Sequence, residues 1–366
     1  MGGLETYVRR LVPELVRAHP KVRFTLFLNA EGREYLGGEE WLDSIEIAVH
    51  PLLGRRWLTA ASELTLLGSL ADRRGLDVLH SVAMTGPLRT KAAHVVMVGD
   101  VIWFHDPAST GRLTATLWKT LVPPVVRRAD RVLTFSEATR RDLARAFAVP
   151  SAKIDVVPLG HGALESAKPT SAARLRETLD VRGSRVILSV SAKRTHKNLR
   201  RLIQALALVR EQVPDAVLVL VGNPTPHEEE LKAEVAALGL DDAVRFPAYV
   251  DAADLEGLYR LASVVAFPSL LEGFGLPILE AMRRGVPVVC SNVSSLPEVG
   301  GDAVRYFDPF DTQAIAAALI EVLTDDDLAR RLVGAGTVRA RLFTWERTAA
   351  ETFASYERAV RARQGR

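Results

Sequence analysis

The sequence of 366 residues lacks several features that would place it in a specialised class. It has a single cysteine, Cys290, so no disulfide can form within the chain, and a reducing compartment fits this composition. No apolar run approaches the roughly 18 residues that a membrane-spanning helix needs. The net charge is +3, too small to indicate nucleic acid as the main partner. These absences predict an ordinary globular protein of the cytoplasm.

Several catalytic chemistries also have no signal in the sequence. No cluster of His, Cys, Asp and Glu has metal-ligand spacing, no Ser-His-Asp arrangement can be argued, and the Gly-Lys-Ser/Thr phosphate loop is missing. The acidic run Asp325-Asp326-Asp327 precedes a helical pattern, so we interpret it as a helix cap rather than a metal motif. We therefore predict neither a metal site nor a resident cofactor.

Short apolar runs alternate with helical patterns along most of the chain, and these runs predict strands. They cover residues 23–28, 45–48, 77–80, 94–98, 131–134, 154–157, 186–190, 216–221, 244–246, 264–267, 287–290 and 304–307. Several are apolar throughout, as in strands that are covered on both faces of a parallel sheet. The alternation predicts two doubly wound α/β domains. A linker rich in Gly, Ser and Pro separates them after Pro158.

We place the domain boundaries from this pattern. The amino-terminal domain covers residues 1–163, the second domain covers 182–343, and a last helix covers 344–366. The chain opens on Gly2-Gly3 and a helical pattern from Leu4, with no strand before it. Because that opening is unusual for an α/β domain, we expect the first strand of the amino-terminal domain to be missing from the chain as given.

Residues 267–290 of the second domain combine the features of a site for a phosphate-bearing ligand. An apolar strand leads into a loop with Glu272, Gly273 and Gly275, and the helix that follows carries Glu280 in its first turn. Glycines allow the backbone to approach a ligand closely, and the amino end of a helix attracts anions. The two carboxylates would flank the anion and accept hydrogen bonds from hydroxyls, which favours a sugar nucleotide. The alternative is that Glu280 only complements the helix dipole.

The loop after the first strand of the second domain is basic. Lys193, Arg194, His196 and Lys197 lie within it, and it leaves the same sheet edge as the Glu272 loop. Cations at this place would neutralise the charge on a departing nucleoside diphosphate without a metal. A solvated surface loop is the alternative, and the neighbouring carboxylate loop makes the diphosphate clamp the favoured interpretation.

Polar residues also follow strands of the first domain. Asp100 comes after the strand over 94–98, at the carboxyl end where open parallel sheets bind ligands. His105 and Asp106 are either an acid and base pair or a hydrogen-bonded turn, and the turn is favoured because such side chains often satisfy their own backbone. Ser136 is predicted to cap a helix.

Basic residues crowd one edge of the first domain. An anionic acceptor, a membrane surface and a solvated helix face are all compatible with this cluster, and an apolar stretch after two arginines is a similar candidate with a packed helix as its alternative. The cluster comprises Arg127, Arg128, Arg131, Arg140 and Arg141, and the second stretch begins at Arg55-Arg56-Trp57-Leu58.

The stretch from Glu272 to Glu280 resembles the E-x7-E signature of glycosyltransferase family 4, a large retaining group with the GT-B fold of two Rossmann-like domains facing a cleft. Pro268-Ser269 before it and Leu296-Pro-Glu298 after it stand in the order usual for that family. Phe343-Thr-Trp345-Glu346 resembles the closing segment, after which the last helix crosses back to the first domain. The resemblance covers essentially the whole chain.

The resemblance implies that the second domain binds most of a nucleotide-diphosphate sugar. Gly3 resembles part of the family's amino-terminal glycine loop, Lys197 with Lys193 or Arg194 resembles the basic pair on the diphosphate, and Glu280 would hold the ribose. Glu272 and Asp100 are the predicted catalytic residues. The full predicted donor-binding set is Gly3, Lys193, Arg194, Lys197, Phe274, Gly275, Leu276 and Glu280. Transfer would retain configuration, require no metal and involve domain closure.

One departure concerns the first domain, since the family often has His-Asp where this chain has Gly99-Asp100. The leading hypothesis is a cytoplasmic transferase that moves a hexose from a UDP- or GDP-sugar to a glycan, lipid-linked or small-molecule acceptor. The hypothesis includes peripheral contact with the inner membrane face and no nucleic-acid partner. The alternatives are a non-catalytic sugar-nucleotide-binding protein and a GT-B-fold sugar-nucleotide epimerase.

Overall fold

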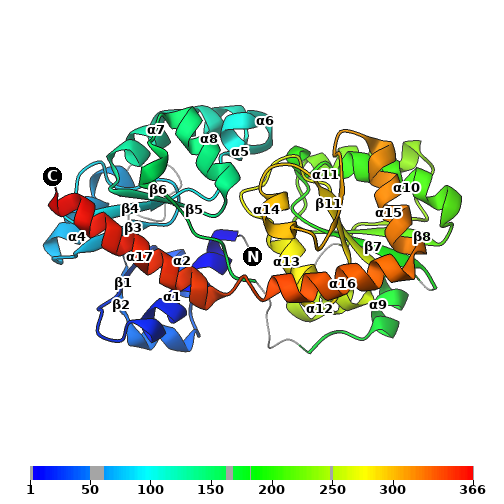
Figure 1. The fold of residues 1–366 in the computed structure, drawn as a ribbon, viewed down its shortest axis with the longest axis horizontal. Helices are drawn as coiled ribbons and strands as arrows, with labels where there is room; N and C mark the ends of the chain where they lie inside the picture. Colours follow the sequence, from blue (N-terminus) through cyan, green and yellow to red (C-terminus); the bar gives the residue numbers. More distant parts are fainter. Residues whose placement is uncertain (1–2, 50–61, 162–167, 182, 248–249, 366) are drawn as a thin grey trace. The chain divides into compact units, whose positions relative to one another are not determined.

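The computed structural model describes residues 3–49, 62–161, 168–181, 183–247 and 250–365. The chain forms two compact units (Figure 1). The first unit comprises residues 1–160 and 344–366, and the second unit comprises residues 161–343. The last helix therefore belongs to the first unit, together with the residues that open the chain.

The first unit is an α/β structure with parallel strands. Its helices are α1 (Gly3–Ala18), α2 (Ala30–Tyr35), α4 (Leu67–Arg73), α5 (Ile102–His105), α6 (Pro107–Thr110), α7 (Arg112–Arg128), α8 (Glu137–Phe147) and α17 (Trp345–Gln364), with short 3₁₀ helices η1 (Glu40–Ser44) and η3 (Ser151–Lys153). Its strands are β1 (Thr25–Leu28), β2 (Glu46–Val49), β3 (Val78–Ser81), β4 (Ala93–Met97), β5 (Arg131–Thr134) and β6 (Ile154–Val156).

Strands β3 to β6 form a four-stranded parallel sheet in sequence order, with helices packed against it. The apolar side chains of β4 and β5 pack with those of α7 and α8, and the rings of Trp103 and Phe147 stack with centroids 5.8 Å apart. Helix α17 packs against α1, β4 and β5. Its Arg363 donates to the carbonyl of Ala92 at 2.9 Å, which ties the end of this helix to the start of β4.

Strands β1 and β2 form a separate parallel pair. Among the described residues, no ladder of hydrogen bonds joins β1 to β3, and a cavity of about 820 Å³ is lined by both strands and by α1. Leu11, Phe24, Leu26 and Leu79 are among its lining residues. The pair of strands β1 and β2 therefore borders this cavity and is not part of the four-stranded sheet.

The second unit is built around one sheet of six parallel strands. These are β7 (Arg185–Val190), β8 (Ala216–Val221), β9 (Val244–Arg245), β10 (Val264–Phe267), β11 (Val288–Ser291) and β12 (Arg305–Phe307). Its helices are α9 (Ala172–Thr178), η4 (Thr195–Lys197), α10 (Leu199–Gln212), α11 (His227–Ala237), α12 (Ala252–Leu261), α13 (Leu276–Arg283), α14 (Leu296–Gly300), α15 (Thr312–Thr324) and α16 (Asp326–Ala340).

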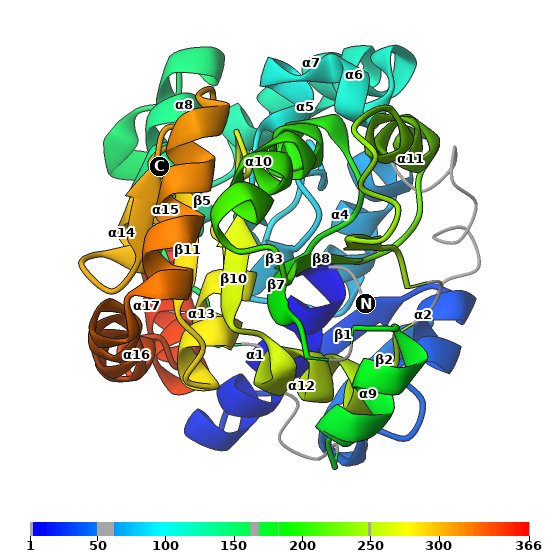
Figure 2. The ribbon, with the colours of Figure 1, turned by 90° about the vertical axis from the view of Figure 1, so that its right-hand side faces the viewer.

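The strand order of this sheet is β12-β11-β10-β7-β8-β9. Strands β7, β8 and β9 follow one another towards one edge of the sheet, and β10, β11 and β12 follow one another towards the other edge. Strands β7 and β10 are therefore neighbours at the centre (Figure 2). Helices α10 and α15 pack together, and they contact β8 and β10, respectively. Helix α12 contacts β7, and α13 contacts β10. This is the doubly wound arrangement, and ligands bind such sheets where the strand order reverses, outside the carboxyl ends of the strands.

The predicted strands agree with the observed ones to within two residues at each end. The prediction was reliable because the central strands are apolar on both faces: all six residues of β8 are buried. The largest shortening is in β1, which begins two residues later than predicted, while the edge strands β6, β9 and β12 are each one residue shorter. The two Rossmann-like α/β domains predicted from the sequence are present.

The buried His94 and the partly buried His80 make the stability of the first unit depend on pH. His80 on β3 contacts the Tyr356 hydroxyl through Nδ1 at 2.8 Å, and His94 on β4 contacts the Ser81 hydroxyl through Nε2 at 3.0 Å. Burial lowers the pKa of His80 to about 3 and the pKa of His94 to about 4. Both side chains are therefore neutral in the folded state at neutral and mildly acidic pH.

We expect the free energy of unfolding to fall as the pH is lowered from 7 towards 5. The unfolded chain protonates each histidine near the ordinary pKa of about 6.5, whereas the folded chain does not, so the loss from each histidine approaches about 1.4 kcal/mol per pH unit once the pH is below that value. Urea unfolding at pH 7, 6 and 5 measures the slope. In His94→Gln, the dependence of the free energy of unfolding on pH should lose the contribution of His94. An unchanged slope in that variant would show that His94 does not contribute to it.

Candidate functional site

Two loops meet at the point where the strand order of the second unit reverses. One follows β7 and carries Lys197, and the other follows β10 and carries Glu272. The Lys197 ammonium donates to the Glu272 carboxylate at 2.5 Å, and the side chains are only 15% and 10% exposed. The sequence predicted that these loops would meet, and the structure brings the two charged side chains into direct contact.

The Lys197 loop is fixed to its neighbours by buried contacts. The main-chain N–H of Leu270 donates to the carbonyl of His196 at 2.8 Å, and the Lys197 ammonium lies 5.5 Å from the centre of the Phe267 ring. Asn198, which is 5% exposed, donates through its amide to the carbonyls of Pro268 and Pro309 at 3.1 and 2.8 Å. One side chain therefore ties together the loops after β7, β10 and β12.

Lys193 has a different environment from Lys197. It is 1% exposed, and its ammonium donates to the carbonyl of Gly222 at 2.8 Å and lies 3.3 Å from the carboxylate of Glu228. Arg194 is exposed at the surface of the same loop. Of the predicted basic pair, Lys197 faces the carboxylate loop, while the charge of Lys193 is satisfied inside the unit.

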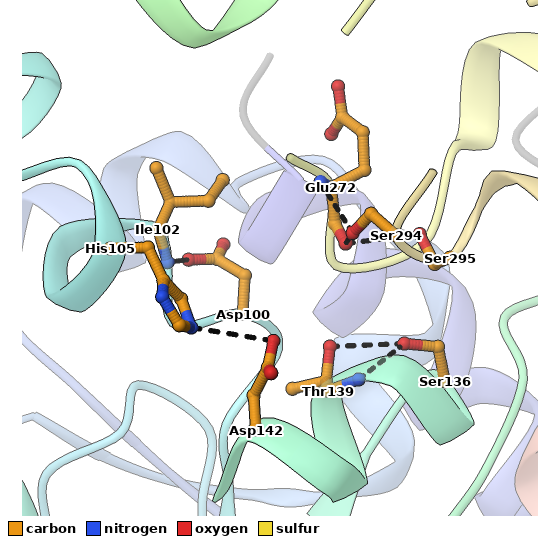
Figure 3. A network of polar contacts seen from close by, with 9 residues as sticks. All are labelled: Asp100, Ile102, His105, Ser136, Thr139, Asp142, Glu272, Ser294 and Ser295. Atoms are coloured by element: carbon orange, nitrogen blue, oxygen red, sulfur yellow. Dashed lines mark hydrogen bonds and ion pairs between the residues drawn. The ribbon is translucent and has the colours of Figure 1, made fainter. Parts of the chain in front are cut away.

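The Glu272 loop is held through its backbone (Figure 3). The Ser294 hydroxyl donates to the Glu272 carbonyl at 2.8 Å and accepts from the Glu272 N–H at 3.1 Å. The Ser295 hydroxyl contacts the carbonyls of Glu272 and Phe274 at 3.1 and 2.8 Å. Gly275 then takes a positive φ of 119° as the N-cap of α13, so Leu276 is the first helical residue. A side chain at this φ would be strained.

Glu280 lies on α13, beyond the first turn in which the sequence placed it, and its carboxylate is positioned by α12. Its carboxylate accepts a hydrogen bond of 2.8 Å from the hydroxyl of Tyr259, which is fully buried. The Arg284 guanidinium lies 4.5 Å from the centre of the Tyr259 ring and donates to Glu256 at 2.6 Å. Burial, with Glu280 beside it, raises the pKa of Tyr259 well above its ordinary value. The phenol therefore remains a hydrogen-bond donor to the carboxylate.

In the first unit, the Asp100 carboxylate accepts from the N–H of Ile102, the first residue of α5, at 3.1 Å (Figure 3). His105 lies 3.6 Å from Asp142 on α8, and the Asp106 side chain caps α6 by accepting from the N–H of Ser109. The interpretation of His105-Asp106 as a turn is thus the one that the contacts support. Asp100 lies after the carboxyl end of β4, as the sequence predicted, and its catalytic role stays a prediction.

Other predictions from the sequence concern caps and the glycines of the first unit. Ser136 caps α8 by accepting from the N–H of Thr139 at 3.1 Å, and Asp325 caps α16, as predicted. Gly3 begins α1, whereas Gly2 lies outside the described residues, as does the stretch from Arg55 to Leu58. A Cβ atom on Gly99 would approach the Phe135 ring to 2.8 Å, so this position has no room for a larger residue without movement of that ring.

Two arginines of the predicted basic cluster form ion pairs within the first unit. Arg131 binds Asp155 at 2.5 Å, and Arg140 binds Glu137 at 2.6 Å. Arg127 donates to the carbonyl of Phe147 at 3.0 Å while remaining exposed at the end of α7. The cluster is therefore not a uniform anion-binding surface.

Three residues of the site were not predicted from the sequence: Asn198, Tyr259 and Ser294. Asn198 has a partial signal, since Asn directly before an apolar helical pattern suggests a helix start. Tyr259 looks like any core residue of α12, and its contact with Glu280 depends on how two helices pack. Ser294 has a φ of 59°, a conformation that no sequence pattern for serine indicates.

Comparisons with known proteins agree with this geometry. The family model for Glycosyltransferase Family 4 matches residues 1–161, and the model for Glycosyl transferases group 1 matches residues 173–339. The chain is 34% identical over 314 residues to the MMP alpha-(1->4)-mannosyltransferase of Mycolicibacterium hassiacum, an alignment covering 80% of this chain and 73% of that protein. The chain therefore belongs to the family 4 glycosyltransferases.

A second relative and a solved structure extend the comparison. The GDP-mannose-dependent alpha-(1-6)-phosphatidylinositol monomannoside mannosyltransferase of Mycolicibacterium smegmatis is 29% identical over 92% of this chain and 89% of its own. The structure of sucrose-phosphate synthase from Thermosynechococcus elongatus matches with a TM-score of 0.74 and 21% identity, covering 97% of this chain and 93% of that one. The fold is GT-B, as the resemblance predicted, and the protein is a glycosyltransferase.

Proposed function

We propose that this glycosyltransferase moves a hexose from a nucleotide-diphosphate sugar to a glycan, lipid-linked or small-molecule acceptor, with retention of configuration and without a metal. The observation that carries the proposal is the contact between Lys197 and Glu272 at the reversal point of the sheet, beside the amino end of α13. One cation, one carboxylate and one helix amino end there match a diphosphate joined to a sugar.

Each group has a distinct role in this proposal. Lys197 neutralises the charge that develops on the leaving nucleoside diphosphate, and the N–H groups at the start of α13 bind the same phosphates. Glu280 accepts hydrogen bonds from the ribose hydroxyls, and Glu272 contacts the hexose. Before the donor binds, Lys197 is paired with Glu272 at 2.5 Å, so the phosphates compete with Glu272 for this ammonium.

The remaining predicted residues take supporting roles. Phe274, Gly275 and Leu276 supply the backbone next to the sugar and phosphates, and Gly275 can adopt the positive φ with which the chain enters α13. Gly3, Arg194 and Asp100 remain proposed contacts to the donor. Lys193 is proposed to act indirectly, because its buried ammonium holds the loop to Gly222 and Glu228.

We propose GDP-mannose as the first donor to test and UDP-glucose as the second. The mannosyltransferase names of the two relatives support mannose, and the name of one specifies GDP-mannose. Incubation with each ¹³C-labelled sugar nucleotide and a panel of acceptors, followed by mass spectrometry, tests transfer. The anomeric signal of the product by NMR tests retention. Transfer that is undiminished in Glu272→Ala would contradict the proposal.

A non-catalytic sugar-nucleotide-binding protein is the second candidate function. The observation that favours it is the crowding of Gly99 by Phe135, at a place where a larger side chain would have to displace the ring. Nucleotide binding with neither transfer nor donor hydrolysis across the acceptor panel would support this alternative. A changed sugar configuration in the donor without any acceptor would instead indicate an epimerase.

The acceptor half of the proposal includes contact with the inner face of a membrane. Helix α7 has basic residues and no acidic ones, and its exposed side chains include Arg112, Leu113 and Leu117, with Leu113 74% exposed. Such a face suits an anionic lipid surface. None of the described helices is both long and apolar enough to cross a membrane. Sedimentation with anionic liposomes should therefore decrease with salt and in Leu113→Ser, whereas equal sedimentation with neutral liposomes would contradict the contact.

Tyr259→Phe is expected to raise the KM for the donor about fivefold and to leave kcat nearly unchanged. The variant keeps the buried ring but removes the hydrogen bond that orients Glu280, and a hydrogen bond to a charged group is worth about 1.5–3 kcal/mol, only part of which reaches the donor. Initial rates against donor concentration measure both constants. Tyr306→Phe is the matched control, because that hydroxyl donates only to the carbonyl of Gly301. Equal effects in both variants would contradict the role of Tyr259.

A further inference from the structure

Ser294 adopts a backbone conformation that is unfavourable for serine. Its φ is 59°, in the left-handed region, and it lies between β11 and α14, whose first residue is Leu296. Outside glycine this conformation is uncommon and costs free energy, so it persists where the surroundings require it. The strain therefore calls for an explanation in the contacts of this residue.

Those contacts are concentrated on one residue of the neighbouring loop. The Ser294 hydroxyl donates to the Glu272 carbonyl at 2.8 Å and accepts from the Glu272 N–H at 3.1 Å (Figure 3). A single hydroxyl thus satisfies both main-chain groups of Glu272. The adjacent Ser295 is fully buried and supports the same loop through the carbonyls of Glu272 and Phe274.

Glu272 therefore has two separate anchors. Its carboxylate is held by Lys197 at 2.5 Å, and its backbone is held by Ser294. In the proposed function the donor diphosphate draws the Lys197 ammonium away from Glu272. After that exchange, the backbone anchor still fixes the position of the residue that contacts the hexose.

We propose that Ser294 is a positioning residue for sugar transfer: its left-handed conformation places the hydroxyl so that Glu272 stays aligned when Lys197 turns to the donor phosphates. The inference rests on the proposed function of the Glu272 loop. It assigns to Ser294 an effect on the sugar part of the donor and little effect on the nucleoside diphosphate, which Lys197 and Glu280 bind.

The test compares Ser294→Gly with Ser294→Ala. Both remove the hydroxyl, but glycine tolerates the positive φ and alanine does not. We expect kcat to fall about 10–50-fold in both variants, since misplacing a reacting group by about 1 Å can cost about 100-fold in rate. The thermal midpoint of Ser294→Gly should be higher than that of Ser294→Ala. Activity near the parent level in Ser294→Gly would overturn the proposal.

Asp180→Gly is the matched control. Asp180 is another non-glycine residue with a positive φ, 51°, in the same unit, and its side chain is 91% exposed. Replacing it relieves the same kind of backbone strain without touching the Glu272 loop. Its kcat should equal that of the parent, and a loss comparable to Ser294→Gly would show that backbone strain alone explains the effect, against the proposal.

A binding measurement separates this inference from the proposed function. Calorimetry with GDP-mannose and GDP, and with UDP-glucose and UDP, gives the affinity contributed by the sugar. Ser294→Gly should reduce that contribution at least threefold and leave diphosphate binding unchanged. If the parent binds sugar nucleotides but transfers nothing, the proposed function fails while this difference still tests Ser294. If the sugar contribution is unchanged in Ser294→Gly, or if the parent binds none of these nucleotides, the inference is wrong.

Discussion

Glu272→Gln is expected to lower kcat for hexose transfer by at least about 100-fold, the range found when one preorganised electrostatic group is removed from an active site. The substitution preserves the size of the side chain and the backbone contacts with Ser294, so the loop should keep its shape. It removes the negative charge that is proposed to lie beside the hexose. The affinity for the nucleoside diphosphate should change only a fewfold, because that part of the donor is proposed to contact Lys197 and Glu280.

Initial rates with a labelled sugar nucleotide, together with calorimetric titration of the nucleoside diphosphate, check both parts of this prediction. Glu234→Gln is the control, because Glu234 is ion-paired with Arg200 at 2.8 Å in the same unit but lies on α11. It should retain the activity of the parent. A Glu272→Gln protein with more than a third of the parent kcat would contradict the catalytic role of Glu272.

Lys197→Met is expected to weaken donor binding about 100-fold. Hydrogen bonds to charged groups are worth about 1.5–3 kcal/mol each, and in the proposed site the diphosphate accepts at least one from this ammonium, which also neutralises part of its charge. The same substitution leaves the Glu272 carboxylate, which is 10% exposed, without its partner. We therefore also expect a loss of stability of about 2 kcal/mol, below the roughly 3–5 kcal/mol of fully buried charge pairs because both side chains are partly exposed.

The double variant Lys197→Met/Glu272→Gln separates these two effects. Removing both charges should restore most of the lost stability, since no unpaired carboxylate remains, but it should not restore donor binding. Lys193→Met shows whether the second lysine predicted to bind the donor contributes to donor affinity. Because Lys193 is 1% exposed and bound to Gly222 and Glu228, its replacement should lower stability more than donor affinity. A 100-fold loss of donor affinity in Lys193→Met, with none in Lys197→Met, would reverse the assignment.

The fold was predictable because its determinants are local and repeated. Strands such as β8 are buried along their whole length, and a continuous apolar run records that directly in the sequence. The meeting of Lys197 with Glu272 was also predictable in outline, since carboxyl ends of neighbouring parallel strands share one edge of the sheet. What the pattern of runs does not encode is the strand order, which makes β7 and β10 neighbours.

The finer features of the site depend on tertiary packing. Lys193 and Lys197 lie four residues apart in one basic loop, yet one is buried against Glu228 and the other faces Glu272, because the loop turns back on itself through η4. Ser294 could not be predicted, because its role follows from a positive φ that serine seldom adopts. The contact between Tyr259 and Glu280 likewise depends on how α12 packs against α13.

The most direct test of the donor site is the thermal unfolding of the chain in the presence of GDP, UDP, ADP and dTDP. The site built from Lys197, Glu280 and the amino end of α13 predicts that at least one of these nucleotides stabilises the protein, by about 2.7 kcal/mol at a hundred times its Kd. The double variant Lys197→Met/Glu280→Gln should lose this stabilisation. Unchanged unfolding of the parent with all four nucleotides, or equal stabilisation of the parent and the double variant, would contradict the account.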